Sequence, residues 1–200
     1  MGILSSLFGP KKIADLETWT GQRVLYLVNS TLPTDLERRL RDNIAPEIFA
    51  RSLAQLQPFR LALFTVYFLK EIEKPEGEDV QAFLERYFQR GAYDHFLEVQ
   101  KLPPPEAEAA LEELGQETRY YFTSLGAHAE SSEAGGIDLY ALCMDKFVER
   151  SLGRVPARDE SGLIGVEANL LHETAKAVYH SDKKWIWEGK AIPSPAEEAR

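Results

Sequence analysis

Apolar residues recur every three or four positions along most of the chain, which is the spacing of one face of an α-helix. Proline and glycine divide the sequence into about nine such segments. The alternation of polar and apolar positions that is typical of a strand occurs only near the C-terminus. We therefore predict an all-α fold, a single-domain irregular helical bundle or array of about eight to nine helices, with a non-helical C-terminal tail.

The most apolar stretch, residues 59–69, has no polar face and carries one arginine, Arg60. A helix that is apolar on all sides needs neighbours on all sides, so we expect this segment at the centre of the bundle. It is also well short of the roughly 20 residues that cross a bilayer. The pattern predicts a core helix and no transmembrane span.

Several residues mark where the helices should begin and end. Thr34 and Glu37 have the spacing of a capping box, which predicts a helix start at Thr34. Gly91 follows the apolar pattern of residues 79–90, and Gly153 follows that of residues 137–152. Glycine is common just past a helix C-terminus, so both are expected to end a helix.

The clearest periodicity lies in residues 106–128, where the apolar face repeats at intervals of four and three. This spacing predicts a long helix whose face packs against another helix. The partner helix belongs either to the same chain or to a second copy in a homodimer. The seam consists of Ala107, Leu111, Leu114, Thr118, Tyr121, Leu125 and His128.

These patterns divide the chain into an apolar N-terminal segment (residues 1–12), a helical domain (13–182) and a Trp-containing, Pro-rich tail (183–200). The net charge of the 200 residues is −9. The acidity is concentrated in residues 76–130, which carry four basic and twelve acidic side chains. Binding to nucleic acid needs clustered positive charge, so this balance argues against it.

A single cysteine, Cys143, lies within an apolar helical pattern and is expected to be a buried, reduced thiol. No cleavable signal peptide is visible, because the lysines follow the first apolar residues instead of preceding them. Both observations favour a cytoplasmic, reducing compartment. A peripheral position at a membrane within that compartment is the alternative location.

The histidines do not form a metal-binding pattern. His172 and Glu173 begin a zinc-protease motif, but Lys176 stands where the second histidine is required. No nucleophile elbow or phosphate-binding loop is present. We predict no metal and no cofactor, and these absences favour a noncatalytic protein, with an enzyme kept within the alternative. A small-molecule pocket beneath residues 59–69, lined by His95, Tyr121 or His128, is the alternative.

Two terminal features are candidates for partner binding. Ile3, Leu4, Leu7 and Phe8 form an apolar stripe that precedes Lys11 and Lys12, which suits a partner's groove, a membrane surface or the protein's own core. Near the other end, Trp185 and Trp187 alternate with other residues among lysines, and large aromatic residues often anchor interfaces.

The leading functional hypothesis is a noncatalytic helical interaction, regulatory or adaptor protein that binds a protein partner through its acidic body and apolar terminal segments. The alternative is a small-molecule- or metal-binding helical protein, with an enzyme included in that class. A third hypothesis is a peripheral membrane adaptor held weakly by residues 1–12.

Overall fold

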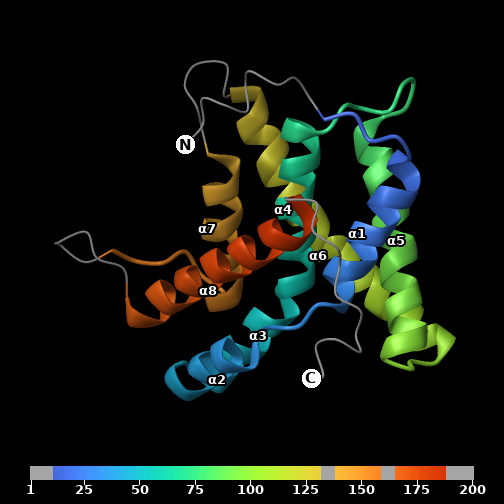
Figure 1. Cartoon of the computed structure of the whole chain (residues 1–200). Helices are drawn as coiled ribbons and strands as arrows, with labels where there is room; N and C mark the ends of the chain where they lie inside the picture. The colour runs from blue at the N-terminus through green and yellow to red at the C-terminus, as the bar shows by residue number, and fades with distance from the viewer. Residues whose placement is uncertain (1–10, 132–137, 159–164, 188–200) are drawn as a thin grey trace.

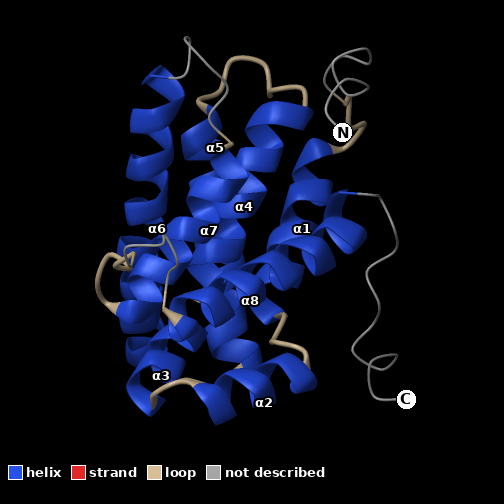
Figure 2. Cartoon of the chain, turned by 90° about the vertical axis from the view of Figure 1, so that its left-hand side faces the viewer, coloured by secondary structure: helices blue, strands red, loops and turns tan. Residues whose placement is uncertain are grey.

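In the computed structural model, every regular element among the described residues is a helix (Figures 1 and 2). The structure describes residues 11–131, 138–158 and 165–187. Within the described helices, the side chains of residues 124, 126–131, 185 and 187 are not described. The predicted all-α bundle is confirmed. Its elements are α1 (Leu16–Asn29), α2 (Thr34–Asn43), α3 (Pro46–Ala54), α4 (Leu56–Glu71), α5 (Val80–Asp94), η2 (His95–Val99), α6 (Pro104–Ser131), α7 (Leu139–Leu152), α8 (Val166–Asp182) and η4 (Lys183–Trp187).

Helix α4 lies at the centre, as its sequence predicts (Figure 1). Every residue from Pro58 to Phe68 is buried, Arg60 included. Helices α1, α5, α6, α7 and α8 all contact it. Aromatic rings hold these contacts together: the Phe59 ring lies 4.8 Å from that of Phe147 on α7, and the Phe68 ring lies 5.7 Å from that of Phe83 on α5.

The long seam of α6 is buried within the chain. Ala107, Leu114, Thr118, Tyr121 and Leu125 are all nearly inaccessible, and α4, α5 and α7 supply the contacts. The partner of this seam is therefore intramolecular. Leu111 is half-buried, and the side chain of His128 lies outside the described residues.

Aspartates begin three of the helices. Asp15, Asp79 and Asp138 each accept a hydrogen bond from a backbone N–H of the first turn, at 2.7–3.0 Å. The predicted capping box at Thr34 is wrong in detail. Helix α2 does begin at Thr34, but Pro33 holds the cap position and no side chain caps the helix.

The two glycines that were expected to end helices behave differently. Gly153 ends α7 in the left-handed conformation (φ 72°), as predicted. Gly91 does not end α5, which continues to Asp94. A Cβ at position 91 would lie 2.8 Å from Cγ1 of Val24, so the glycine is there to let α1 approach α5 closely.

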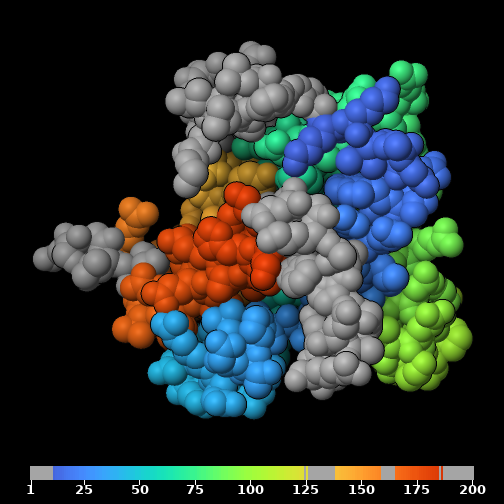
Figure 3. All heavy atoms as spheres, viewed as in Figure 1, coloured from blue at the N-terminus to red at the C-terminus, as the bar shows by residue number. Residues whose placement is uncertain are grey.

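The two ends of the described chain are attached to the body. Backbone hydrogen bonds join Lys11 to Glu71 and Glu73, beside the end of α4. Helix α8 lies next to α2 (Figure 3), where Arg39 pairs with Glu173 at 2.7 Å. The first five residues of the predicted tail, Lys183–Trp187, continue α8 as a π-helical turn with Ile186 buried, and residues 188–200 lie outside the description.

Candidate interaction groove

A hollow of about 380 Å³ lies between α5 and α6, above one side of α4. Its floor is apolar because α4, α5 and α6 direct apolar side chains into it, and the Phe88 and Phe122 rings stack there at 5.9 Å. The lining residues are Leu61, Glu85, Phe88, Gln89, Glu108, Leu111, Glu112, Leu114, Gly115, Thr118, Arg119 and Phe122.

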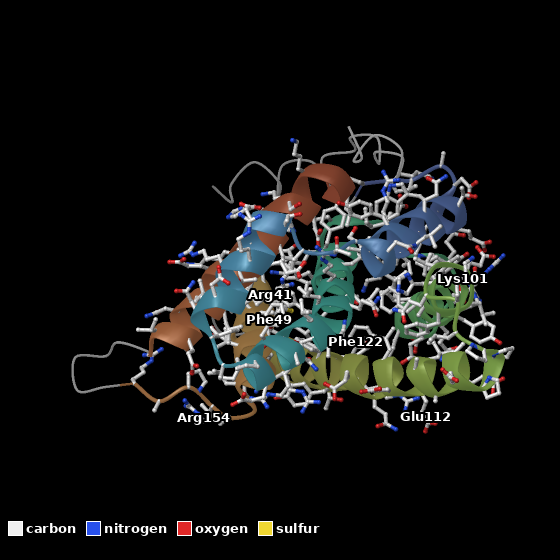
Figure 4. The ribbon with its side chains drawn as sticks, turned by 90° about the horizontal axis from the view of Figure 1, so that it is seen from below. Arg41, Phe49, Lys101, Glu112, Phe122 and Arg154 are labelled. Atoms are coloured by element: carbon white, nitrogen blue, oxygen red, sulfur yellow. The ribbon has the colours of Figure 1, made fainter. Side chains whose placement is uncertain are left out.

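Gly115 lines this first hollow. It stands in the interior of α6, where glycine is unfavourable by roughly 1 kcal/mol relative to alanine. A Cβ at this position would meet nothing within 4 Å. The glycine is therefore not required by close packing, in contrast to Gly91. Figure 4 shows Phe122 on the side of α6 that faces α4, with Glu112 at the outer edge of the same helix.

A second hollow of about 270 Å³ continues from the first, and Phe122 lines both. Its walls are mostly apolar, and one of them is Leu69, a residue of the central helix that is 42% exposed. We name the two hollows together the α5–α6 groove. The second is lined by Thr65, Val66, Leu69, Asp79, Val80, Gln81, Leu84, Phe122, Leu125 and Leu139.

The rim of the first hollow is acidic. Glu85 is half-buried, and Glu108 and Glu112 are exposed. Gln81 donates to Glu85 at 3.1 Å, and Gln116 donates to Glu112 at a long 3.5 Å. None of the three carboxylates forms an ion pair within the described part of the chain. Arg119 is the cation on this rim, so the carboxylates outnumber it.

A polar cleft of about 470 Å³ lies elsewhere, between α3, α4, α6 and α7, and two of its charged side chains are Glu117 and Arg150. These two bind each other: the Nε of Arg150 donates to Oε2 of Glu117 at 3.0 Å, and its Nη2 donates to both carboxylate oxygens. Gln55 also donates to Glu117, at 2.8 Å. Their hydrogen-bonding capacity is largely used inside the protein.

Arg51 completes the same cleft and serves the end of α7. Its guanidinium donates to the carbonyl oxygens of Ser151 and Leu152, at 2.9 and 3.1 Å. These carbonyls belong to the last turn of α7 and have no partners in the helix itself. The side chains of the polar cleft thus bind groups within the protein and join its helices. The α5–α6 groove, in contrast, has charged groups that are available to a partner.

The residues that sequence reasoning assigned to a ligand pocket do not share one. His95 is buried against α1 and α4: its Nδ1 lies 2.8 Å from Oδ1 of Asn29, and its Nε2 lies 3.3 Å from the amide of Gln57 and 2.9 Å from that of Gln100. Burial lowers its pKa from the ordinary value. Tyr121 is buried elsewhere and donates to Oε1 of Gln55 at 3.3 Å.

Neither His95 nor Tyr121 lines the α5–α6 groove or the polar cleft. The backbone of His128 lies in the last part of α6. Leu61, Thr65 and Val66 of the central helix α4 line the α5–α6 groove instead.

The terminal candidates are outside this geometry. Ile3, Leu4, Leu7 and Phe8 lie outside the described residues, and Trp185 and Trp187 are described only as backbone in η4. Cys143 is buried, and burial raises its pKa to about 12, as expected of a structural thiol.

Within the described ranges, no group of three or more His, Cys, Asp or Glu side chains has an arrangement that could hold a metal ion. In these same ranges, no helix has the length and apolar character needed to cross a membrane.

Glu85, Gly115 and Phe122 were not singled out by the sequence. The one local signal was Gly115, a glycine inside a strongly periodic helix with no turn to explain it. Comparison with protein-family models, with curated proteins and with solved structures gives no match for this chain.

Proposed function

We propose that this protein is a noncatalytic interaction module that captures a basic helical segment of a partner protein in the α5–α6 groove. The observation that carries the proposal is an apolar floor beneath three rim carboxylates, Glu85, Glu108 and Glu112, that form no ion pair among the described residues. An amphipathic helix fits such a groove by placing its apolar face on the floor.

Charge explains why the partner should be basic. The residues between 76 and 130 carry twelve acidic and four basic side chains, and this segment contains α5 and most of α6. Opposite charges at the rim of an interface accelerate association and exclude partners of the wrong sign. This charge supports assigning the partner-binding role of the acidic body to the rim of the α5–α6 groove. The terminal segments remain a separate proposed contact.

The test uses a short helical peptide of about 18 residues with leucine on one face and lysine on the others. We expect it to bind the wild-type protein in a fluorescence anisotropy titration. Gly115→Leu should place a side chain in the first hollow, at a position where a Cβ meets nothing within 4 Å, and should abolish most of the binding. Ala50→Leu adds an exposed leucine on α3, outside the groove, and is the control.

Two results would contradict this function. One is the absence of peptide binding to the wild-type protein. The other is binding that Gly115→Leu leaves unchanged. A homodimer that occupies its own groove would also replace the proposal, and sedimentation equilibrium would reveal it as a dimer that Gly115→Leu dissociates.

A second candidate is an apolar small-molecule site in the same groove. The first hollow, at about 380 Å³, is within the size range of small-molecule sites, about 300–1,000 Å³. Native mass spectrometry of protein purified gently from its source cells distinguishes the two. An added noncovalent mass of a few hundred daltons, absent from Gly115→Leu, would favour the small molecule, whereas a second polypeptide would favour the interaction module.

A further inference from the structure

We infer that the partner helix inserts two apolar anchors seven residues apart, one into each hollow of the α5–α6 groove, with its basic residues around the anchor in the first hollow. This inference rests on the proposed function and specifies which helix the groove accepts.

The two hollows follow one another along all three helices that form them. On α5 the lining moves from residues between 85 and 89 in the first hollow to residues between 79 and 84 in the second. On α4 it moves from Leu61 to Thr65, Val66 and Leu69, and on α6 from residues between 108 and 122 to Phe122 and Leu125. The two hollows are therefore neighbouring parts of one groove and not separate sites.

Their separation selects the spacing of the anchors. Between the middles of the two sets of lining residues, the shift is about six positions on α4 and α5 and about nine on α6, which at about 1.5 Å per residue is about 9–13 Å. On a bound helix, anchors at i and i+4 are about 6 Å apart along the axis, and anchors at i and i+7 are about 10.5 Å apart. Only the second spacing reaches both hollows.

The ring of Phe122 lies between the two hollows. Because of this ring, the partner should use two separate apolar anchors and not one continuous apolar strip. The Phe122 ring stacks on Phe88 at 5.9 Å, and both hollows use it as a wall. A partner side chain placed above Phe122 would meet an occupied position. The residues between the two anchors should therefore be small or should point away from the groove.

The acidic side chains are distributed unevenly between the two hollows. Glu85, Glu108 and Glu112 all line the first hollow. The second hollow has one acidic residue, Asp79, and that carboxylate already accepts a hydrogen bond from the backbone N–H of Gln81 as the cap of α5. Lysine or arginine near the first anchor would gain most from the rim, so the charge fixes which end of the partner helix occupies which hollow.

The experiment compares peptides of equal length and equal lysine content that differ in their anchors. One has two leucines at i and i+7, one has them at i and i+4, and one has a single leucine. We expect the i, i+7 peptide to bind about tenfold more tightly than the single-anchor peptide, because it buries one more leucine. We expect the i, i+4 peptide to bind like the single-anchor one.

A variant of the protein tests the second hollow separately. Leu69→Asn places a polar group in the wall of the second hollow, and because Leu69 is already 42% exposed the fold should tolerate the change. It should remove the advantage of the i, i+7 peptide and leave the single-anchor peptide unaffected. Leu25→Asn changes a leucine of similar exposure (45%) on α1 and is the matched control.

The charge element is tested by replacing Glu85, Glu108 and Glu112 with glutamine together. This variant should weaken the lysine peptides about tenfold at low salt and flatten the salt dependence of their binding. The control has the same loss of three charges at exposed positions outside the groove, Glu47, Glu76 and Glu98.

The outcomes separate this inference from the proposed function. In one outcome all the peptides bind, Gly115→Leu blocks their binding, and the anchor spacing has no effect on affinity. The two-anchor arrangement is then wrong, and the proposed function of the groove stands. Equal binding by both triple glutamine variants would overturn the charge assignment in the same way. If none of the peptides binds the wild-type protein, the proposed function itself fails.

Discussion

Arg60 and Asp182 face each other in the interior, 3.3 Å apart from Nε to Oδ2, with their side chains only 3% and 2% exposed. Arg60 also donates to the carbonyl oxygens of Ser30 and Thr31, so it joins the α1–α2 connection to α4 and to the end of α8. Within the described part of the chain, neither oxygen of the Asp182 carboxylate accepts a hydrogen bond. Burial raises the pKa of Asp182 to about 6, although the guanidinium acts in the opposite direction.

This carboxyl should make stability depend on pH. Because its pKa in the folded protein, about 6, is above the ordinary 3.8, the folded state binds the proton more tightly than the unfolded state. Its contribution is therefore most favourable at low pH and is lost as the pH rises from about 4 to 6, by about 3 kcal/mol. Asp182→Asn should match the wild type near pH 4 and be relatively more stable near pH 7.

Urea unfolding of both proteins at several pH values measures this difference directly. The quantity to compare is the difference in unfolding free energy between wild type and variant, since other titrating groups are common to both. A difference that is constant from pH 4 to 7 would show that Asp182 does not titrate in this window.

His95 should show the opposite dependence. Burial lowers its pKa, so the unfolded state takes up the proton more readily and the contribution of His95 to stability is lost as the pH falls through its ordinary value of 6.5. The Nδ1–H donates to Asn29, which leaves Nε2 to accept from Gln57 and Gln100. An NMR titration of the imidazole should give a pKa below 6.5.

Asn29→Asp provides the complementary test at the same position. It places a carboxylate 2.8 Å from Nδ1, which favours the charged imidazolium and should raise the pKa of His95. An unchanged titration in this variant would mean that His95 does not face residue 29 in solution.

Two glycine-to-alanine substitutions should act in opposite directions. Gly91→Ala forces a Cβ to 2.8 Å from Val24 and should destabilise the protein by about 1–3 kcal/mol. Gly115→Ala meets nothing within 4 Å, improves the helix propensity of α6 and should stabilise by up to about 1 kcal/mol. Chemical denaturation measures both. A loss of stability at position 115 similar to that at 91 would show that the first hollow is filled.

The thiol of Cys143 should be inert in the folded protein. It is buried, and its pKa of about 12 leaves almost no thiolate at neutral pH. We expect iodoacetamide at pH 8 to label it only after unfolding in urea, as judged by intact mass. Rapid stoichiometric labelling of the native protein would contradict its placement in the core.

The fold class and the central helix could be predicted because they depend on patterns within single segments. Residues 59–69 have no polar face, and that property alone requires neighbours on all sides. Two glycines show that patterns within a single segment do not predict every helix end. Gly91 and Gly153 both follow apolar helical patterns, yet Gly153 ends its helix and Gly91 does not. The difference is the approach of Val24, a residue 67 positions away in the sequence, and no local signal contains it.

The candidate groove was missed for a related reason. The heptad pattern placed Leu111 and Leu114 on one face of α6, but the space beside them depends on how α5 lies against that face. His95, Tyr121 or His128 was predicted from the sequence to line a pocket beneath residues 59–69. The structure gives the first two their own hydrogen-bond partners, among them Asn29 at the end of α1 and Gln55 between α3 and α4.

The burial of α4 has a consequence for synthesis of the protein. Its neighbours α1 and α5–α8 lie on both sides of it in the sequence, and α6 and α7 supply much of its cover. Roughly 80 residues separate the end of α4 from the end of α7, so at about 5–20 residues per second the ribosome needs about 4–16 s to deliver that cover. During this interval the most apolar segment of the nascent chain lacks the helices that cover it in the folded protein.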